Sequence, residues 1–260
     1  MVFLNCFPGG VTNCVTFSFD DGAKEDIRLS ELFNKYGLKC TFNLSDCMIR
    51  VPDEVFEKTY KGHEIACHGK NHIKINMATD MSVIDEIITN RKTLEGKTGY
   101  TVCGHAYAGG YHDDHSIETL KKCGIVYART TMDTNLFDVP KDFMHWRPTC
   151  HQKRAVELTE RFLKYLDDNH PRLLYIWGHS FEFRAEEDWA EFEKACQMLA
   201  NNDKIWYATN MQIYDYVMAQ KSLRISADES IIYNPSAIDV WVSVDKQAVK
   251  IPAGQSVKVQ

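Results

Sequence analysis

Short apolar runs alternate with segments of helical periodicity along most of the chain. Each run reads as a buried strand, and together they cover residues 15–19, 39–44, 63–67, 101–106, 125–129, 173–177 and 205–208. Helical patterns lie between most of them, at residues 25–36, 52–60 and 81–94, near Asp114 and Gln152, and around Trp189. This alternation is typical of a parallel sheet with helical crossovers. Seven such units over about 210 residues favour a closed or nearly closed α/β barrel over an open sheet.

The pattern changes from Leu223 onward. Three short runs at residues 231–233, 240–244 and 257–259 read as strands, with no helical pattern between them. We therefore predict a barrel over residues 1–220 and a small β-rich extension over residues 221–260. Because about 40 residues bury little core of their own, the extension is expected to pack on the barrel.

Composition and charge exclude several classes of partner. With 260 residues, of which 44% are apolar, the chain can form one large core. The net charge is −6 and no basic run occurs, so neither nucleic acid nor an anionic membrane is expected as a partner. No apolar run approaches the roughly 20 residues of a membrane span. Nine cysteines without a Cys-x-x-Cys pair indicate reduced thiols, and the first ten residues lack a signal-peptide pattern, so we expect a cytoplasmic location unless a leader was removed.

Two adjacent carboxylates, Asp20 and Asp21, follow the first strand and precede Gly22. Two aspartates at the end of an apolar strand repel each other, and a divalent cation would neutralise the pair and take one carboxylate as a ligand. The alternative is that one of them only caps the following helix, since a turn from strand to helix favours aspartate for that purpose.

Other predicted strands also end in residues that can carry chemistry. In parallel α/β folds reactive side chains lie at the carboxyl ends of strands. The strand at residues 63–67 is followed by His68 and His72, and the strand at residues 173–177 by His179. A spacing of four places both imidazoles on one side of a helical turn, where they can join an aspartate as a two-His-one-carboxylate metal site. The alternative is that His72 is an ordinary surface histidine.

These residues, in this order, resemble the motifs of polysaccharide deacetylases, the metal-dependent hydrolases of carbohydrate esterase family 4 that share the NodB-like homology domain. The resemblance spans about residues 10–215 and rests on four segments: Thr16 to Gly22, His68 to His72, a tyrosine-containing glycine loop at residues 106–110, and Trp177 to Ser180. It implies a distorted (β/α)7 barrel, so that the predicted fold is this barrel with a small C-terminal β appendage. It implies a divalent metal ion, zinc first with cobalt, manganese or nickel as alternatives. It also implies roles for five residues: Asp20 as general base, Asp21, His68 and His72 as metal ligands, and His179 as general acid.

Two of the family's motifs are altered in this chain. The third usually reads Arg-x-Pro-aromatic-Gly, but residues 106–110 here hold neither arginine nor proline. We expect Arg147 to supply the missing cation, the alternative being a surface ion pair. The fourth motif usually reads Asp-Trp and is His145-Trp146 here, so Asp142 or Glu182 is expected to orient the acid instead. The expected substrate-binding residues are Tyr107, Gly109, Trp146 as a sugar platform, and Arg147. Other histidines, such as His112, His115, His151 and His170, are expected in solvated loops.

The resemblance therefore implies a hydrolase of carbon–nitrogen bonds other than peptide bonds. Its expected substrates are N-acetylglucosamine-containing saccharides of the chitooligosaccharide or peptidoglycan type. A backbone amide near Gly109 would hold the oxyanion together with the metal. The alternatives are an O-acetyl esterase acting on acetylated xylan and a non-catalytic saccharide-binding relative that keeps the metal for structure.

Overall fold

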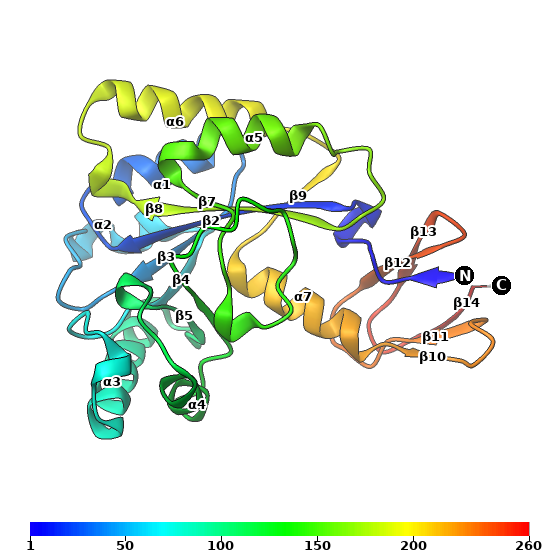
Figure 1. The fold of residues 1–260 in the computed structure, drawn as a ribbon, viewed down its shortest axis with the longest axis horizontal. Coiled ribbons are helices and arrows are strands. Elements are labelled where there is room, and N and C mark those ends of the chain that lie inside the picture. Colours follow the sequence, from blue (N-terminus) through cyan, green and yellow to red (C-terminus); the bar gives the residue numbers. More distant parts are fainter. Residues whose placement is uncertain (260) are drawn as a thin grey trace.

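A curled parallel sheet forms the body of the protein, as the computed structural model of the chain shows for residues 1–259 (Figure 1). The strand order is β6-β5-β4-β3-β2-β8-β7. The bounds are β2 (Asn13–Asp21), β3 (Cys40–Leu44), β4 (Glu64–Cys67), β5 (Gly104–Ala106), β6 (Tyr127–Arg129), β7 (Cys150–His151) and β8 (Arg172–His179). A further strand, β9 (Ile205–Tyr207), pairs with the first residues of β2. The predicted α/β barrel is thus confirmed.

Helices pack around the outside of this curled sheet. They are α1 (Asp26–Lys35), α2 (Asp53–Tyr60), α3 (Asp80–Thr98), α4 (Asp114–Lys122), α5 (Ala155–Leu163), α6 (Glu186–Leu199) and α7 (Asn210–Ser222). Figure 1 shows α5 and α6 side by side on one side of the barrel and α3 with α4 on the other. Helix α3 runs past the predicted end at residue 94 and stops where Gly99 adopts a positive φ of 73°. The pattern analysis did not detect α7.

Strand β2 separates an apolar layer from a polar one. All nine of its residues are buried. Phe17 packs with Phe33 of α1 and Phe192 of α6, at ring-centroid distances of 4.7 and 6.0 Å. Since side chains alternate along a strand, Thr16, Ser18 and Asp20 face the opposite side, the interior of the curled sheet. The interior therefore holds polar side chains, and these reach the carboxyl ends of the strands.

The segment from Trp146 to His151 connects the two edges of the curled sheet. The Trp146 amide donates to the Ala128 carbonyl in β6 at 3.1 Å, and the Thr130 amide donates back to the Trp146 carbonyl at 2.9 Å. A few residues later, Cys150 and His151 pair in parallel with β8. One short stretch thus joins β6 to β8 and curls the sheet into a barrel. Strand β7 escaped the pattern analysis because two residues show no periodicity.

The last residues, together with β1 from the start of the sequence, form two small antiparallel sheets, β1-β12-β13 and β10-β11-β14. Their strands are β1 (Val2–Phe3), β10 (Arg224–Ile225), β11 (Ile231–Tyr233), β12 (Val240–Val244), β13 (Gln247–Ile251) and β14 (Ser256–Lys258). Ile232, Val242, Val244 and Ile251 form their shared apolar core. The Trp241 amide donates to the Tyr216 hydroxyl of α7 at 2.9 Å, which ties these sheets to the barrel. Within residues 1–259, no helix has both the length and the apolar character that crossing a membrane requires.

Candidate active site

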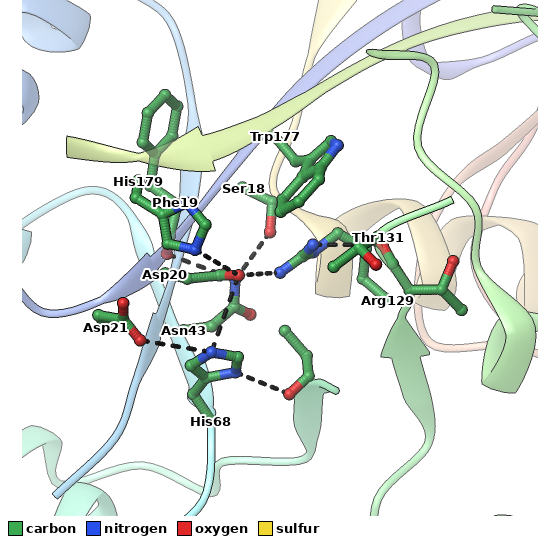
Figure 2. A network of polar contacts seen from close by, with 12 residues as sticks. Ser18, Phe19, Asp20, Asp21, Asn43, His68, Arg129, Thr131, Trp177 and His179 are labelled. Atoms are coloured by element: carbon green, nitrogen blue, oxygen red, sulfur yellow. Dashed lines mark hydrogen bonds and ion pairs between the residues drawn. The ribbon is translucent and has the colours of Figure 1, made fainter. Parts of the chain in front are cut away.

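Four strands deliver charged and imidazole side chains to one place at their carboxyl ends (Figure 2). Asp20 and Asp21 end β2, His68 follows β4, Arg129 ends β6 and His179 ends β8. The Asp20 Oδ2 atom lies 3.8 Å from His68 Nε2 and 3.9 Å from His179 Nε2. The sequence-predicted base, ligands and acid are therefore neighbours in the structure.

Three donor atoms converge as a metal site requires. Asp21 Oδ1 lies 3.5 Å from His68 Nε2 and 3.6 Å from His72 Nε2, and the two nitrogens are 3.1 Å apart. His68 donates its Nδ1 hydrogen to the Ala106 carbonyl at 2.8 Å, so its Nε2 lone pair faces the other two atoms. Within residues 1–259 the buried Asp21 Oδ1 has no hydrogen-bond donor. A carboxylate oxygen and two imidazole nitrogens that need a positive partner fit a divalent cation of the zinc class.

Left-handed backbone, rather than a helical turn, brings His72 to this site. Residues 68–72 form no helix, and the expectation of one is wrong. Gly69 and His72 have positive φ values of 87° and 56°, and Asp21 has 82°. A Cβ on Gly69 would lie 2.6 Å from Glu86 Oε1, so only glycine fits there. Non-glycine residues adopt such conformations at a cost of about 1–3 kcal/mol, and they gather at functional sites.

Helix α3 holds the loop that carries both histidines. The buried Glu86 carboxylate accepts from the Asn71 amide at 2.7 Å and from the Asn71 side chain at 3.0 Å. The Asn90 Oδ1 atom accepts from the amides of His68 and Gly69, each at 3.1 Å. Buried polar side chains on α3 therefore set the geometry of the loop. Sequence reasoning missed both, although a glutamate and an asparagine at an i,i+4 spacing inside an otherwise regular helix are a visible signal.

Asp20 is held by two side chains from neighbouring strands. The Arg129 Nη2 atom forms an ion pair with Asp20 Oδ2, and Asn43 Nδ2 donates to Asp20 Oδ1 at 2.8 Å. Arg129 also lies over the Trp177 ring, 4.7 Å from its centroid. Burial alone would raise the pKa of Asp20, but the Arg129 guanidinium, with smaller contributions from His68 and His179, lowers it to about 2. Asp20 is therefore ionised at neutral pH.

Arg129 takes the place that we expected Arg147 to fill. Arg147 is exposed, and no carboxylate pairs with it anywhere in residues 1–259. Arg129 is completely buried against Asp20. Arg129 reaches Asp20 because β5 and β6 pair with Ala106 opposite Arg129. A side chain one strand away thus reaches the position that the altered third motif leaves without a cation.

Two of the expected substrate-binding aromatics lie in the core instead. Trp146 is 1% exposed and packs edge-on against Tyr127, Phe143 and Tyr175, so it offers no face to a sugar. Tyr107 is fully buried, and its hydroxyl donates to the Met144 carbonyl at 2.9 Å. Gly109 is exposed in a 3₁₀ turn (Ala108–Gly110), where its φ is 60°.

Glu182 is the carboxylate beside the expected acid. Its Oε1 atom lies 3.0 Å from His179 Nδ1, whereas Asp142 pairs with His145 at 2.7 Å. Lys153 Nζ binds Glu182 Oε2 at 3.0 Å, and His151 Nε2 lies 3.6 Å from Glu182 Oε1. His151, expected in a solvated loop, is thus half-buried beside the site.

His151, His179 and Glu182 also lie close enough together to hold a cation. However, the Lys153 ammonium already neutralises Glu182, so this second group suits a cation less well than Asp21, His68 and His72 do. An exposed aromatic lies near the acid: the Phe181 ring is 5.1 Å from the His179 ring.

Residues 10–128 match the family model of polysaccharide deacetylase. No curated protein matches the sequence significantly. A solved Mycobacterium smegmatis protein assigned to the polysaccharide deacetylases is 19% identical, with a TM-score of 0.65, over 83% of this chain and 93% of that one. Puue allantoinase is 13% identical, with a TM-score of 0.63, over 80% of this chain and 91% of its own. A family 4 carbohydrate esterase from Streptomyces lividans, solved in complex with acetate, is 15% identical, with a TM-score of 0.52, over 75% of this chain and 91% of its own.

These solved proteins share the fold of carbohydrate esterase family 4 with this chain. Their low identities establish fold alone, and the family match adds the sequence pattern of the first strands. Residues 10–128 carry the sequence pattern of a polysaccharide deacetylase, and the resemblance drawn from the motifs is confirmed.

Proposed function

We propose that the protein is a metal-dependent hydrolase that releases acetate from N-acetylglucosamine-containing saccharides. The convergence of Asp21, His68 and His72 beside the buried, ionised Asp20 carries this proposal. A structural zinc usually has four protein ligands, whereas three here leave a position open for water and substrate. The acetate bound to the Streptomyces lividans enzyme, which shares this fold, supports an acyl product.

Asp21, His68 and His72 are the residues that would hold the metal. When bound, a zinc-class ion supplies a Lewis acid for the acetyl carbonyl and makes water more acidic. Asp20 then needs only to accept a proton, which its ionised state allows. Because Arg129 and Asn43 fix both of its carboxylate oxygens, Asp20 presents a single orientation to the reacting water.

His179 lies across the site from the metal ligands, 3.9 Å from Asp20. Its Nδ1 hydrogen faces Glu182 at 3.0 Å, which fixes the ring and leaves Nε2 directed at the substrate position. In its protonated form His179 donates to the leaving nitrogen of the sugar, because an amine anion is too basic to depart. The products are acetate and a free amino sugar, with the proton taken by Asp20 balanced by the proton given by His179.

The test is an acetate-release screen of zinc-loaded protein on chitooligosaccharides, peptidoglycan fragments and acetylated xylan. Release from the first two supports the proposal, whereas release from xylan alone identifies an O-acetyl esterase. No release from any of them, with zinc bound, identifies the non-catalytic relative.

Two variants separate the roles of the adjacent aspartates. Asp21→Asn should lose zinc and activity together, since it removes the anionic ligand. Asp20→Asn should keep zinc but lose activity by about 10²- to 10⁴-fold, the usual contribution of a positioned base. Asp142→Asn, which affects a carboxylate paired with His145 instead, is the matched control and should change neither. Loss of zinc from Asp20→Asn with retention in Asp21→Asn would reverse the two roles.

A further inference from the structure

The interior of the barrel is unusually polar. Barrel interiors are generally filled by branched aliphatic side chains. Here the side chains that face inward include Thr16, Ser18, Thr41, Asn43 and Glu64, all of them buried. Buried polar groups require partners, so each of them must be placed by another.

Asn43 lies at the top of this polar interior, against the expected base. Its Nδ2 atom is 2.8 Å from Asp20 Oδ1 and 2.8 Å from Ser18 Oγ, with a longer contact of 3.4 Å to the Phe19 carbonyl. An amide nitrogen carries two hydrogens, and one goes to Asp20 and the other to Ser18. The opposite orientation of the amide would set its oxygen against the Asp20 carboxylate. The contact therefore allows one orientation of Asn43 and, through it, one orientation of Asp20.

Further buried hydrogen bonds lie below this contact in the barrel. Thr16, two residues before Ser18 on β2, donates to Asn210 Oδ1 at 3.1 Å. The Tyr175 hydroxyl accepts from Asn210 Nδ2 at 2.6 Å, and Asn210 is the first residue of α7. The Asn210 backbone amide donates to Thr41 Oγ1 at 2.9 Å. The Thr41 hydroxyl in turn donates to the buried Glu64 carboxylate at 2.9 Å. These bonds tie β2, β3 and β8, the strands around Asn43, to the start of α7.

We propose that Asn43 is a positioning residue for Asp20, held in turn by Ser18. This rests on the proposed function in taking Asp20 as the general base. Arg129 supplies the charge that keeps Asp20 ionised but contacts only one of its oxygens. Asn43 fixes the other oxygen and with it the plane of the carboxylate. A carboxylate free to rotate about its last bond would present the wrong lone pair to the reacting water for much of the time.

The test compares zinc-loaded Asn43→Leu with the unchanged protein. Leucine has nearly the shape of asparagine but donates no hydrogen bond. We expect kcat to fall about 10- to 100-fold, as is usual for a residue that orients a reacting group from behind. KM and zinc content should stay within about twofold, because neither the substrate nor the metal ligands contact Asn43. Ser18→Ala, which removes the acceptor of the second Asn43 hydrogen, should show a smaller loss of the same kind.

Thr159→Val is the matched control. Thr159 is a buried threonine on α5 whose hydroxyl has no partner in residues 1–259, so the variant removes a buried polar group outside the network. It should keep kcat unchanged. An unchanged kcat in Asn43→Leu, or an equal loss in Thr159→Val, would overturn the proposal. If Asn43→Leu does not fold, Ser18→Ala replaces it, since it frees the Asn43 amide from below.

A crystal structure of Asn43→Leu tests the proposal without any activity. The Asp20 carboxylate should be rotated or occupy more than one orientation, and an unchanged Asp20 would refute the positioning role. If the unchanged protein hydrolyses no acetylated saccharide, the proposed function fails, and this structural result still decides the role of Asn43.

Discussion

Replacing Arg129 by methionine removes the cation beside Asp20 while keeping a side chain of similar length. The side chain of Arg129 is 0% exposed and that of Asp20 is 2% exposed. The variant therefore leaves the buried Asp20 carboxylate without its arginine partner. Loss of one member of such a pair usually lowers the free energy of unfolding by about 3–5 kcal/mol. The pKa of Asp20 agrees in direction, since it is lowered from 3.8 to about 2 although burial alone would raise it.

The pH dependence of this stability follows from the direction of the shift. Because the pKa of Asp20 is lower in the folded chain, its contribution is present above about pH 4 and is lost as the pH falls through about 2. In Arg129→Met, burial acts without its main opposing charge and raises the pKa of Asp20. The deficit of the variant should therefore be largest near neutral pH and should shrink as the pH falls and Asp20 takes up a proton.

Urea denaturation of metal-free protein, followed by tryptophan fluorescence, measures both effects. Arg147→Met is the matched control, since Arg147 is exposed and should change stability by no more than about 0.5 kcal/mol. Adding Asp20→Asn to Arg129→Met should recover part of the loss, because the unpaired charge is then gone. A loss below about 1 kcal/mol in Arg129→Met, or an equal loss in Arg147→Met, would refute the assignment of Arg129 as the partner of Asp20.

Three further substitutions test other parts of the site and its surroundings. Glu182→Gln should lower kcat about 10- to 100-fold with zinc content unchanged, because the ring of His179 loses its anionic partner. Steady-state kinetics and elemental analysis measure the two quantities, and a fall in both kcat and zinc content would indicate a purely structural effect. Burial raises the pKa of Asp26 from 3.8 to about 7, so its stabilising neutral form is complete below about pH 4 and is lost as the pH rises through about 7. In Asp26→Asn the fall in Tm between about pH 5 and about pH 8 should flatten, and calorimetry showing the original slope would contradict this. Trp146→Ala should lose about 3–5 kcal/mol of stability with KM unchanged, whereas a large rise in KM at full stability would restore the sugar-platform interpretation.

The positions of Asp20, Asp21, His68 and His179 were predictable because parallel strands point their carboxyl ends the same way. An apolar run locates the end of a strand, and the reactive residue stands just beyond it. The same rule applies to Arg129, the last residue of its predicted strand. It was overlooked because the search for the cation followed the family's third motif instead of the neighbouring strand. Register between β5 and β6 decides which side chain fills that place, and a single sequence does not display register.

Trp146 shows a different limit. Its position in the sequence correctly predicts that it lies near the carboxyl end of the sheet. The sequence does not predict the direction in which its side chain points. The Trp146 backbone pairs with β6, and this turns the indole into a cluster of aromatic rings. His72 is a similar case, since its approach to His68 depends on left-handed backbone that the i,i+4 spacing does not reveal. Spacing and strand ends predicted which residues meet, while side-chain direction depended on pairing and on local φ.

The pairing of β1 with β12 makes the beginning of the chain part of its last structural unit. Val2 lies opposite Val244 and Phe3 opposite Ser243. The sheet of β1, β12 and β13 can therefore be completed only after residues 240–251 have been synthesised, long after the barrel strands are available. In a variant that lacks residues 1–3, β12 presents a free edge of backbone amides and carbonyls. Free edges of this kind pair with other chains, so the first three residues shield the protein from self-association.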